Sequence, residues 1–249
     1  MSGHSKWATI KHKKGAADAK RGKTFTRIIK ELSVAARAGG GDVDMNPRLR
    51  TIVADAKAAN MPRENIERAI RRGTGEEPGV SYEEITYEGY GPGGAALLIQ
   101  TLTDNKNRTV GEIRHTLGKH AGNLAAENSV AWLFSKKGQV FVEKGKVDEE
   151  KLLAAVLEAG ADDLNDDESA WEIVCAPDHL EAVKAAVKAL GVEPASAEVA
   201  MVPKNYVKLV GKEAQQMLRL MEAIEDHDDV QHVWANFDIE EKEIEASLT

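Results

Sequence analysis

Residues 139–165 read QVFVEKGKVDEEKLLAAVLEAGADDLN, with the apolar spacing of a strand, a helix and a second strand in turn. Residues 170–202, AWEIVCAPDHLEAVKAAVKALGVEPASAEVAMV, show the spacing of a strand, a helix and a strand again. The pattern predicts strands at 139–143, 162–165, 170–176 and 196–202, and helices at 149–159 and 178–190. This β-α-β-β-α-β order is the ferredoxin-like arrangement.

Further strand and helix patterns lie on both sides of this segment. On the N-terminal side, two strands form a hairpin around the glycine-rich loop 89–94, and Thr109 and Glu112 form a capping box that opens a helix. We therefore predict a second ferredoxin-like α/β domain, built from residues 78–135 plus 206–249, with residues 136–205 inserted in its middle. Its expected elements are strands at 85–87, 95–102, 129–134, 206–210 and 230–237, and a second helix at 213–225.

The N-terminal part of the chain shows helical spacing of its apolar residues. Residues 1–22 lack that spacing, and we interpret them as a flexible arm. Three helices are expected after the arm, at residues 23–38, 46–60 and 62–72, bounded by Gly39 to Gly41, Asn46, Pro47 and Gly73. Residues 1–77 are thus predicted to form a basic arm and a three-helix bundle, and the whole chain is predicted to be an α+β protein.

Positive charge is concentrated at the N-terminus of an acidic chain. Nine of the first thirty residues are Lys or Arg and one, Asp18, is acidic, while the 249 residues carry a formal net charge of −8. Residues 1–80 carry a charge of +8 and residues 81–249 a charge of −16. A cluster of cations costs self-repulsion, and its common use is to neutralise the phosphates of a nucleic acid. We therefore expect a nucleic-acid partner for the N-terminal part.

The candidate nucleic-acid-binding residues lie in the arm and on the first two helices. Trp7 has two roles that the sequence leaves open, since its ring could stack on a base or hold the arm against a helix. In the third helix, Glu64 and Glu67 precede Arg68 and Arg71 by four residues, a spacing that favours ion pairs within the helix. No helix shows a row of base-reading residues, which favours contacts to phosphate. The candidates are Lys6, Trp7, Lys11, His12, Lys13, Lys14, Lys20, Arg21, Lys23, Arg27, Lys30, Arg48 and Arg50.

Composition and motifs argue against several classes of protein. The chain has neither the apolar core of a signal peptide nor a run of about twenty apolar residues, so we expect a cytoplasmic protein without a membrane partner. The single Cys175 lies in an apolar run and is interpreted as a buried, inert thiol. The motifs of common hydrolases and nucleotide-binding enzymes are missing, so we expect neither catalysis nor a cofactor.

Two short matches to nucleotide- and RNA-binding motifs carry little weight. The loop 89–94 matches the G-x-G-x-x-G spacing, but Pro92 and the strand pattern after it indicate a hairpin rather than a dinucleotide site. Residues 137–142 match part of an RNA-recognition motif without two of its three aromatic residues. The tryptophans outside the arm are accordingly interpreted as core residues: Trp132, Trp171 and Trp234.

Clusters of acidic residues suggest a third class of function, a hydrolase or metalloenzyme. The cluster Asp162, Asp163, Asp166, Asp167 and Glu168 fails the EF-hand pattern, because Glu168 stands at the glycine position and Val174 at the final acid. We interpret this cluster as a solvated turn and expect no metal. Residues 225–229, EDHDD, are interpreted as a loop after a helix, with contact to basic proteins as the alternative.

Longer motifs resemble the YebC/PmpR family over nearly the whole chain. They are GHSKW at 3–7, NPRLR at 46–50, AKAANMP at 56–62, YEGYGPGG at 87–94, LTDNKNRT at 102–109 and SVAWLF at 129–134. The sequence departs from the family pattern at residues 43–44 and 127–128, which concerns local loop geometry. The resemblance implies the same inserted domain. It also implies a transcriptional regulator that binds DNA or, for some members, a translation factor at the ribosome.

We therefore predict a non-enzymatic, DNA-binding regulator of transcription. The alternative is a ribosome-associated translation factor or activator that binds ribosomal RNA, because charge alone does not separate the two nucleic acids. The acidic domains are expected to contact partner proteins or to set the spacing between partners.

Overall fold

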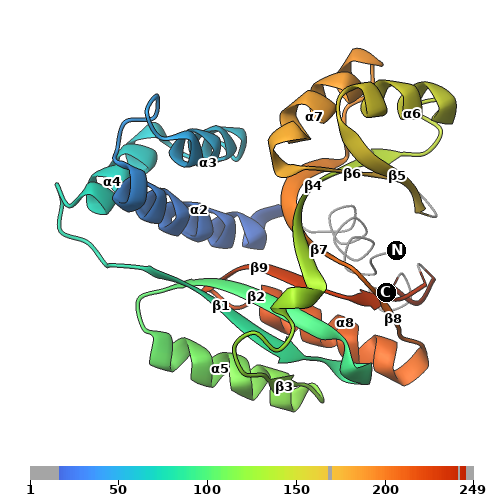
Figure 1. The fold of residues 1–249 in the computed structure, drawn as a ribbon. Coiled ribbons are helices and arrows are strands. Elements are labelled where there is room, and N and C mark those ends of the chain that lie inside the picture. The colour runs from blue at the N-terminus through green and yellow to red at the C-terminus, as the bar shows by residue number, and fades with distance from the viewer. Residues whose placement is uncertain (1–16, 168–169, 241, 245–249) are drawn as a thin grey trace.

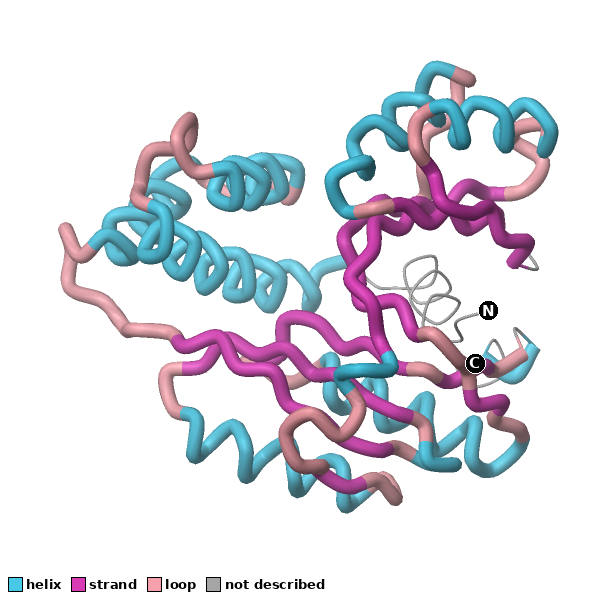
Figure 2. Tube along the Cα trace, in the orientation of Figure 1, coloured by secondary structure: helices cyan, strands magenta, loops and turns pink. Residues whose placement is uncertain are grey.

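The computed structural model describes residues 17–167, 170–240 and 242–244, which form a helical bundle and two parts that each contain a four-stranded sheet (Figure 1). Figure 2 shows that the two sheets face the centre of the molecule while their helices lie outside. This arrangement of helices and sheets confirms the α+β class. None of the helices in the described ranges has the length and apolar character of a membrane span.

The bundle is built from helices α2 (Ala17–Gly39), α3 (Pro47–Ala58) and α4 (Arg63–Thr74). Their apolar stripes meet in one core around Leu32, Leu49 and Ile66. Asn46 caps α3 as predicted, because its side-chain oxygen accepts the Leu49 N–H at 3.1 Å. Helix α2 begins at Ala17, so the backbone of residues 17–22 is helical, and the prediction that these residues belong to a flexible arm is wrong.

Helix α4 packs closely against α2 at Gly73. The prediction of Gly73 as the C-terminal cap is wrong, because α4 continues to Thr74 and the left-handed cap is Gly75, with a φ of 84°. Gly73 lies inside the helix, where a Cβ atom would come 2.4 Å from the Ser33 carbonyl oxygen. The Ser33 hydroxyl donates to the Ala69 carbonyl oxygen at 3.1 Å across the same contact. The absence of a side chain at Gly73 is therefore what lets the two helices approach.

Replacing Gly73 with Ala is expected to lower the free energy of unfolding by about 1–3 kcal/mol, because the added methyl group pushes α2 and α4 apart. Gly22→Ala is a matched control in the same bundle, since a Cβ atom there meets nothing within 4 Å. Alanine also favours a helix over glycine at such an open position. Urea unfolding compares the two variants, and a Gly73→Ala variant as stable as the unaltered chain would contradict the close packing.

The middle part is a sheet of strand order β3-β1-β2-β9 with two helices on one face (Figure 1). Its elements are β1 (Glu83–Tyr90), β2 (Ala96–Thr103), α5 (Lys106–Lys119), β3 (Asn123–Leu124), α8 (Gly211–Glu225) and β9 (Val230–Ala235). Strands β1 and β2 pair antiparallel around the one-turn helix η1 (Pro92–Gly94), which confirms a hairpin at the glycine-rich loop. Strand β9 follows the inserted segment in sequence but pairs with β2, so both flanks build one sheet.

A short parallel pair of strands, β8 (Val207–Lys208) and β10 (Phe237–Asp238), lies outside this sheet. The expected strand at 206–210 therefore exists in shortened form. The chain order of the middle part, β-β-α-β and then α-β, differs from the order of the inserted part, although both pack two helices on one face of an antiparallel sheet.

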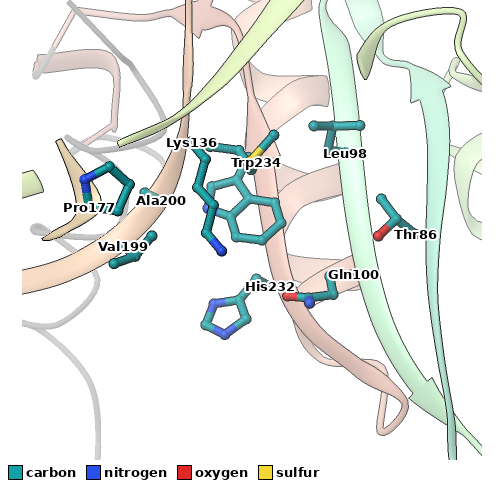
Figure 3. Close-up of a pocket in the computed structure, with 10 residues that line it drawn as sticks. Thr86, Leu98, Gln100, Lys136, Pro177, Val199, Ala200, His232 and Trp234 are labelled. Atoms are coloured by element: carbon teal, nitrogen blue, oxygen red, sulfur yellow. The ribbon is translucent and has the colours of Figure 1, made fainter. Parts of the chain in front are cut away.

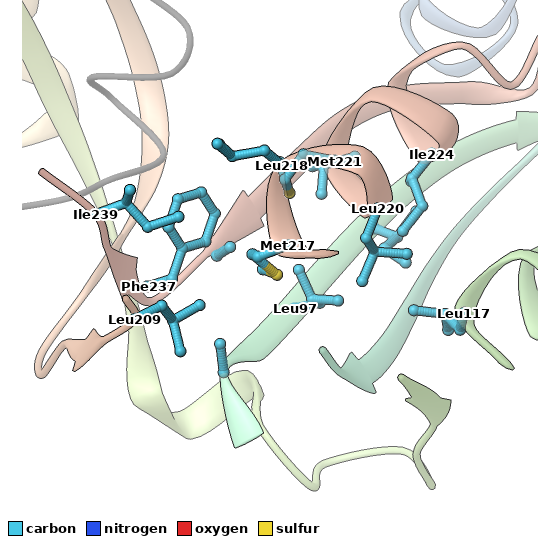
Figure 4. Close-up of a cluster of buried hydrophobic side chains, with 14 of the residues drawn as sticks. Leu97, Leu117, Leu209, Met217, Leu218, Leu220, Met221, Ile224, Phe237 and Ile239 are labelled. Carbon is cyan, nitrogen blue, oxygen red and sulfur yellow. The ribbon is translucent and has the colours of Figure 1, made fainter. Parts of the chain in front are cut away.

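The core of the middle part lies between the sheet and helices α5 and α8 (Figure 4). Leu97 from β2, Leu117 from α5 and Leu220 from α8 have no exposed area. Met217 of α8 covers Gly91 so tightly that a Cβ atom there would lie 2.8 Å from the methionine sulfur. Because the helices cover only this face, the other face of the sheet is turned toward the bundle and the inserted part.

Helix α5 begins before the predicted capping box. Its N-cap is Asn105, whose side-chain oxygen accepts the Arg108 N–H at 3.1 Å. Thr109 lies one turn inside the helix and is fully buried. The capping-box prediction is therefore wrong, and the Thr109 hydroxyl has the long-range partner described below.

The inserted part has strand order β5-β6-β4-β7, and all neighbouring strands are antiparallel. Its elements are β4 (Phe134–Glu143), α6 (Glu149–Glu158), β5 (Ala161–Asp167), β6 (Ala170–Cys175), the one-turn helix η3 (Pro177–His179), α7 (Leu180–Ala189) and β7 (Ser196–Pro203). This order confirms the predicted β-α-β-β-α-β pattern. The expected strand at 129–134 is wrong: a one-turn helix, η2 (Ala131–Leu133), leads directly into β4.

The acidic cluster of the inserted part lies on a strand rather than in a turn. Asp162 of β5 forms an ion pair with Lys137 of β4. Asp166 of β5 forms an ion pair with Lys144, the residue that follows β4. The interpretation as a solvated turn is therefore wrong for its described members. β6 lies between β5 and β4 in the sheet, so these ion pairs bridge two strands that are not hydrogen-bonded neighbours.

The single cysteine and the tryptophans have three different environments. Cys175 is fully buried, and burial raises the pKa of its thiol, as expected for an inert residue. Trp171, 8% exposed, belongs to the core as predicted. Trp132 on η2 is 65% exposed, so its assignment to the core is wrong. Trp234 is partly buried on the open face of the middle sheet.

Candidate nucleic-acid interface

The candidate residues of the arm lie outside the described residues. These are Lys6, Trp7, Lys11, His12, Lys13 and Lys14, together with the side chains of Lys20 and Arg21 on α2. Their part in binding stays a prediction. The candidates with described side chains are Lys23, Arg27, Lys30, Arg48 and Arg50.

Three of the described candidates lie on one face of α2, against the acidic loop 225–229 that follows α8. Lys23 Nζ donates to the Asp226 carbonyl oxygen at 3.1 Å and lies 3.2 Å from the Asp226 carboxylate. Arg27 donates to the carbonyl oxygen of Glu225. The acidic loop therefore binds a basic surface, and that surface is a helix of the same chain.

Lys30, the third of these cations, forms a buried ion pair with Asp229. Its Nζ lies 2.7 Å from Asp229 Oδ1, and the two residues are 7% and 4% exposed. The ammonium also donates to the carbonyl oxygens of Asp228 at 2.9 Å and Leu102 at 3.3 Å. Lys30 thus joins the bundle to the middle part, and its ammonium is enclosed in this arrangement. Lys30 is therefore not accessible to a phosphate in this arrangement.

Helix α5 holds the second carboxylate oxygen of Asp229. Oδ2 accepts from Arg108 Nη2 at 2.8 Å and from the Thr109 hydroxyl at 2.7 Å. Burial alone would raise the pKa of Asp229, but the hydrogen bonds from Lys30, Arg108 and Thr109 hold it well below its ordinary value. One aspartate therefore links α2, α5 and the loop after α8.

A cation-binding constellation also overlaps this network. Potential ligand atoms of Glu112, His227 and Asp229 lie within 4.8 Å of one another. His227 Nε2 and Glu112 Oε2 are already 2.9 Å apart, and Asp229 accepts from Lys30 and Arg108. A metal ion would have to displace these donors and would lie beside two cations. The geometry is that of an ion-pair network.

Five arginines of α3 and α4 are held by partners nearby in space: Arg48, Arg50, Arg63, Arg68 and Arg71. Arg48 Nη2 lies 2.9 Å from Glu84 Oε2 on β1, and Arg50 donates to backbone carbonyl oxygens of residues 43 and 44. In α4 the predicted Glu64–Arg68 pair is present at 2.9 Å. The predicted Glu67–Arg71 pair is replaced by Arg63–Glu67 and Arg71–Glu77, each at 2.6 Å.

Glu88 organises the connection between the middle and inserted parts. Its buried carboxylate accepts the N–H groups of Asn128 and Val130, each at 2.6 Å, and of Ala131 at 2.9 Å. Burial alone would raise the pKa of Glu88, but these backbone hydrogen bonds lower it below the ordinary value. Sequence reasoning missed this role, because it depends on a loop about forty residues away in the chain.

Glu88 and Asp229 are expected to make the fold sensitive to acid. The unfolded chain protonates such carboxyls near pH 4, whereas their lowered pKa values keep them ionised in the folded chain. The folded state therefore binds fewer protons, and its stability falls as the pH falls below about 4 toward the folded pKa values. Thermal unfolding across this pH range measures the loss. The Glu88→Gln variant should show a shallower fall, and an identical fall would contradict the role of Glu88.

Comparisons with known proteins cover both the bundle and the two sheet-containing parts. The family model described as "TACO1/YebC protein N-terminal domain" matches residues 5–76, and that described as "TACO1/YebC second and third domain" matches residues 82–237. A probable transcriptional regulatory protein of Koribacter versatilis is 59% identical over 245 residues, covering 98% of both chains. One of Acidobacterium capsulatum is 61% identical over 243 residues, again covering 98% of both chains.

A solved structure shows the same fold. The crystal structure of a conserved hypothetical protein, Aq1575, from Aquifex aeolicus superimposes with a TM-score of 0.78. The two chains are 46% identical, and the match covers 90% of this chain and 92% of that one. The chain therefore belongs to the TACO1/YebC family, whose two bacterial relatives above carry the name of probable transcriptional regulatory proteins.

Proposed function

We propose that the chain is a non-enzymatic, nucleic-acid-binding regulator of gene expression that acts in the cytoplasm, with DNA as its first candidate target. The observation that carries the proposal is the segregation of charge, +8 over residues 1–80 against −16 over residues 81–249. The names of the bacterial relatives, probable transcriptional regulatory proteins, support the regulatory role in transcription.

The proposed contacts combine the arm with exposed cations of the bundle. Lys23 and Arg48 are paired with carboxylates, but their side chains are 47% and 49% exposed. Exposed ion pairs contribute about 0–1 kcal/mol, so a phosphate can replace the carboxylate at little cost. Arg50 is exposed beside backbone carbonyls and is available in the same way. The interface therefore consists of the arm candidates with Lys20, Arg21, Lys23, Arg48 and Arg50.

The anchoring of α2 supports a mechanical link between binding and the acidic body. Lys30 and Arg27 attach the helix to the loop after α8, a few turns beyond its start at Ala17. A nucleic acid held by Lys23 of the same helix is thereby placed at a fixed position relative to the sheet-containing parts. Those parts carry a net negative charge, and their acidic surfaces are proposed to contact proteins.

Ribosomal RNA is the second candidate target. Arg27 and Lys30 of α2 and Arg48 of α3 contact other parts of the chain, so these three candidates do not form a free basic face for a DNA groove. Recognition of phosphate without reading bases suits structured RNA as well as DNA. This observation favours a ribosomal target over sequence-specific DNA binding.

Parallel binding assays separate the two targets. Gel shifts with promoter DNA and co-sedimentation with translating ribosomes are carried out at the same physiological salt. Binding to DNA alone supports the transcriptional role, and binding to ribosomes alone supports the translational role. If neither complex survives physiological salt, the proposal of a nucleic-acid-binding regulator is wrong.

A further inference from the structure

A cavity of about 390 Å³ lies between the open face of the middle sheet and the inserted part (Figure 3). The middle sheet contributes Gln100 from β2 and His232 and Trp234 from β9, and the inserted part contributes Lys136 from β4 and Val199 from β7. Figure 3 shows these side chains converging from the two parts. The volume falls near the lower end of the range of about 300–1,000 Å³ that small-molecule sites occupy. The cavity therefore suits one small ligand.

The rings of His232 and Trp234 form a flat stack along one side of the cavity. Their centroids are 5.4 Å apart and their planes differ by 7°. His232 is exposed, whereas Trp234 packs partly against the buried cluster that contains Leu98. A parallel pair of this kind is a surface on which another flat ring can stack.

The charge of the cavity is opposite to that of the molecule. None of the described residues that line it is acidic, and Lys136 supplies a cation. Among the described residues, no carboxylate lies within ion-pair distance of Lys136. In a chain with a net charge of −8, such a place favours an anionic ligand.

Gln100 is oriented at the edge of the cavity by a chain of polar contacts. Its Nε2 donates to Glu84 Oε1, while Arg48 holds Glu84 Oε2 at 2.9 Å. With its nitrogen directed to Glu84, the amide oxygen of Gln100 is left to accept a hydrogen bond from a ligand. Glu84 is the carboxylate that Gln100 contacts, and Arg48 compensates its negative charge.

We propose that this cavity binds a single nucleotide, with its base on the His232 and Trp234 rings and its phosphate at Lys136. A base supplies the flat ring and an N–H donor for the Gln100 amide oxygen, which is an exocyclic amino group in adenine, guanine and cytosine and the ring N3–H in uracil. The phosphate supplies the anion. The inference rests on the proposed function in one respect: the nucleotide can belong to the nucleic-acid strand that the protein is proposed to bind. A free nucleotide has the same chemistry, and the experiment separates the two sources.

The test is a titration of the full-length protein with each of the four ribonucleoside monophosphates, the matching nucleosides and inorganic phosphate. The side-chain N–H signals of the four tryptophans are followed by NMR and assigned with Trp→Phe variants. The Trp234 signal is expected to shift saturably with nucleotides, while that of the buried Trp171 stays in place. His232→Ala should weaken nucleotide binding by about tenfold.

Lys136→Gln tests the phosphate contact separately from the ring contact. It is expected to weaken binding of nucleotides but not of nucleosides, and Lys151→Gln on the exposed side of α6 is the matched control. Both altered side chains are exposed, so neither variant removes core packing. No shift of Trp234 with any nucleotide, equal binding by His232→Ala, or equal binding of inorganic phosphate and nucleotides would overturn the proposal.

A short single-stranded oligonucleotide identifies the source of the nucleotide. If His232→Ala also weakens oligonucleotide binding, the cavity holds a nucleotide of a strand. If only the monophosphates are affected, the ligand is free in solution. The Lys11, Lys13, Lys14→Glu variant should lose oligonucleotide binding through the arm and retain the Trp234 shift with monophosphates, so failure of the arm proposal and failure of the cavity proposal give different results.

Discussion

Replacing Asp229 with Ala is expected to lower the free energy of unfolding by about 3–5 kcal/mol, the range for removing one partner of a buried ion pair. The substitution leaves the Lys30 ammonium, 7% exposed, without its carboxylate. It also removes one acceptor of Arg108 and one of Thr109, which keep their contacts to Asp104 and to the Asn105 carbonyl oxygen. Because these donors come from α2 and α5, the loss should loosen the bundle from the middle sheet as well as destabilise the fold.

Urea unfolding measures this loss, and Asp226→Ala is the matched control in the same loop. Asp226 pairs with Lys23 at 3.2 Å, but the two side chains are 64% and 47% exposed, so its removal should cost no more than about 1 kcal/mol. The double variant Lys30→Met, Asp229→Ala should recover part of the stability that Asp229→Ala loses, because it no longer buries an uncompensated cation. Equal effects of Asp226→Ala and Asp229→Ala would show that the Lys30 pair is not the anchor.

Replacing Lys11, Lys13 and Lys14 with Glu is expected to abolish binding to the nucleic-acid target. The change turns three cations of the arm into anions, so that phosphate contacts become repulsions. Binding is measured at fixed salt with whichever target, DNA or ribosomes, the unaltered chain retains. The folded body should keep its stability, which unfolding of the same variant verifies.

A variant with the same change of net charge controls for general repulsion. Lys146, Lys151 and Lys188 of the inserted part are exposed. Lys146 pairs with Glu143, three residues before it, and Lys188 pairs with Glu193, five residues after it. Their replacement with Glu should leave most of the affinity intact, because these three lysines lie outside both the proposed interface and the lining of the cavity at Lys136. If both triple variants bind equally well, the arm has no special role.

The amino-acid pattern was sufficient for the fold where the determinants are local. Asn46 and Pro47 predicted the start of α3 correctly, and apolar alternation located the strands and helices of the inserted part. The errors concern positions where two residues fit the same local role. Gly73 and Gly75 both suit a helix cap, and only the packing of Gly73 against Ser33 decides between them. Asn105 and Thr109 pose the same choice at the start of α5.

The interface was harder to predict because its contacts join residues far apart in the chain. Lys30 looks like any other cation of a basic helix, yet its partner lies 199 positions away. The sequence contained one indication of this contact, the acidic residues of loop 225–229, for which no partner within the chain was predicted. The charges of α2 and of that loop are complementary, but the sequence alone does not show that they pair, since the same cations could bind phosphate.

The dependence of affinity on salt measures the proposed grip of the arm on phosphate. If about five cations contact phosphates, the logarithm of the association constant for the full chain should fall against the logarithm of salt concentration with a slope of about −4 to −5. The Lys11, Lys13, Lys14→Glu variant should have no measurable complex to titrate. A flat response of the unaltered chain, on DNA and on ribosomes alike, would contradict the account.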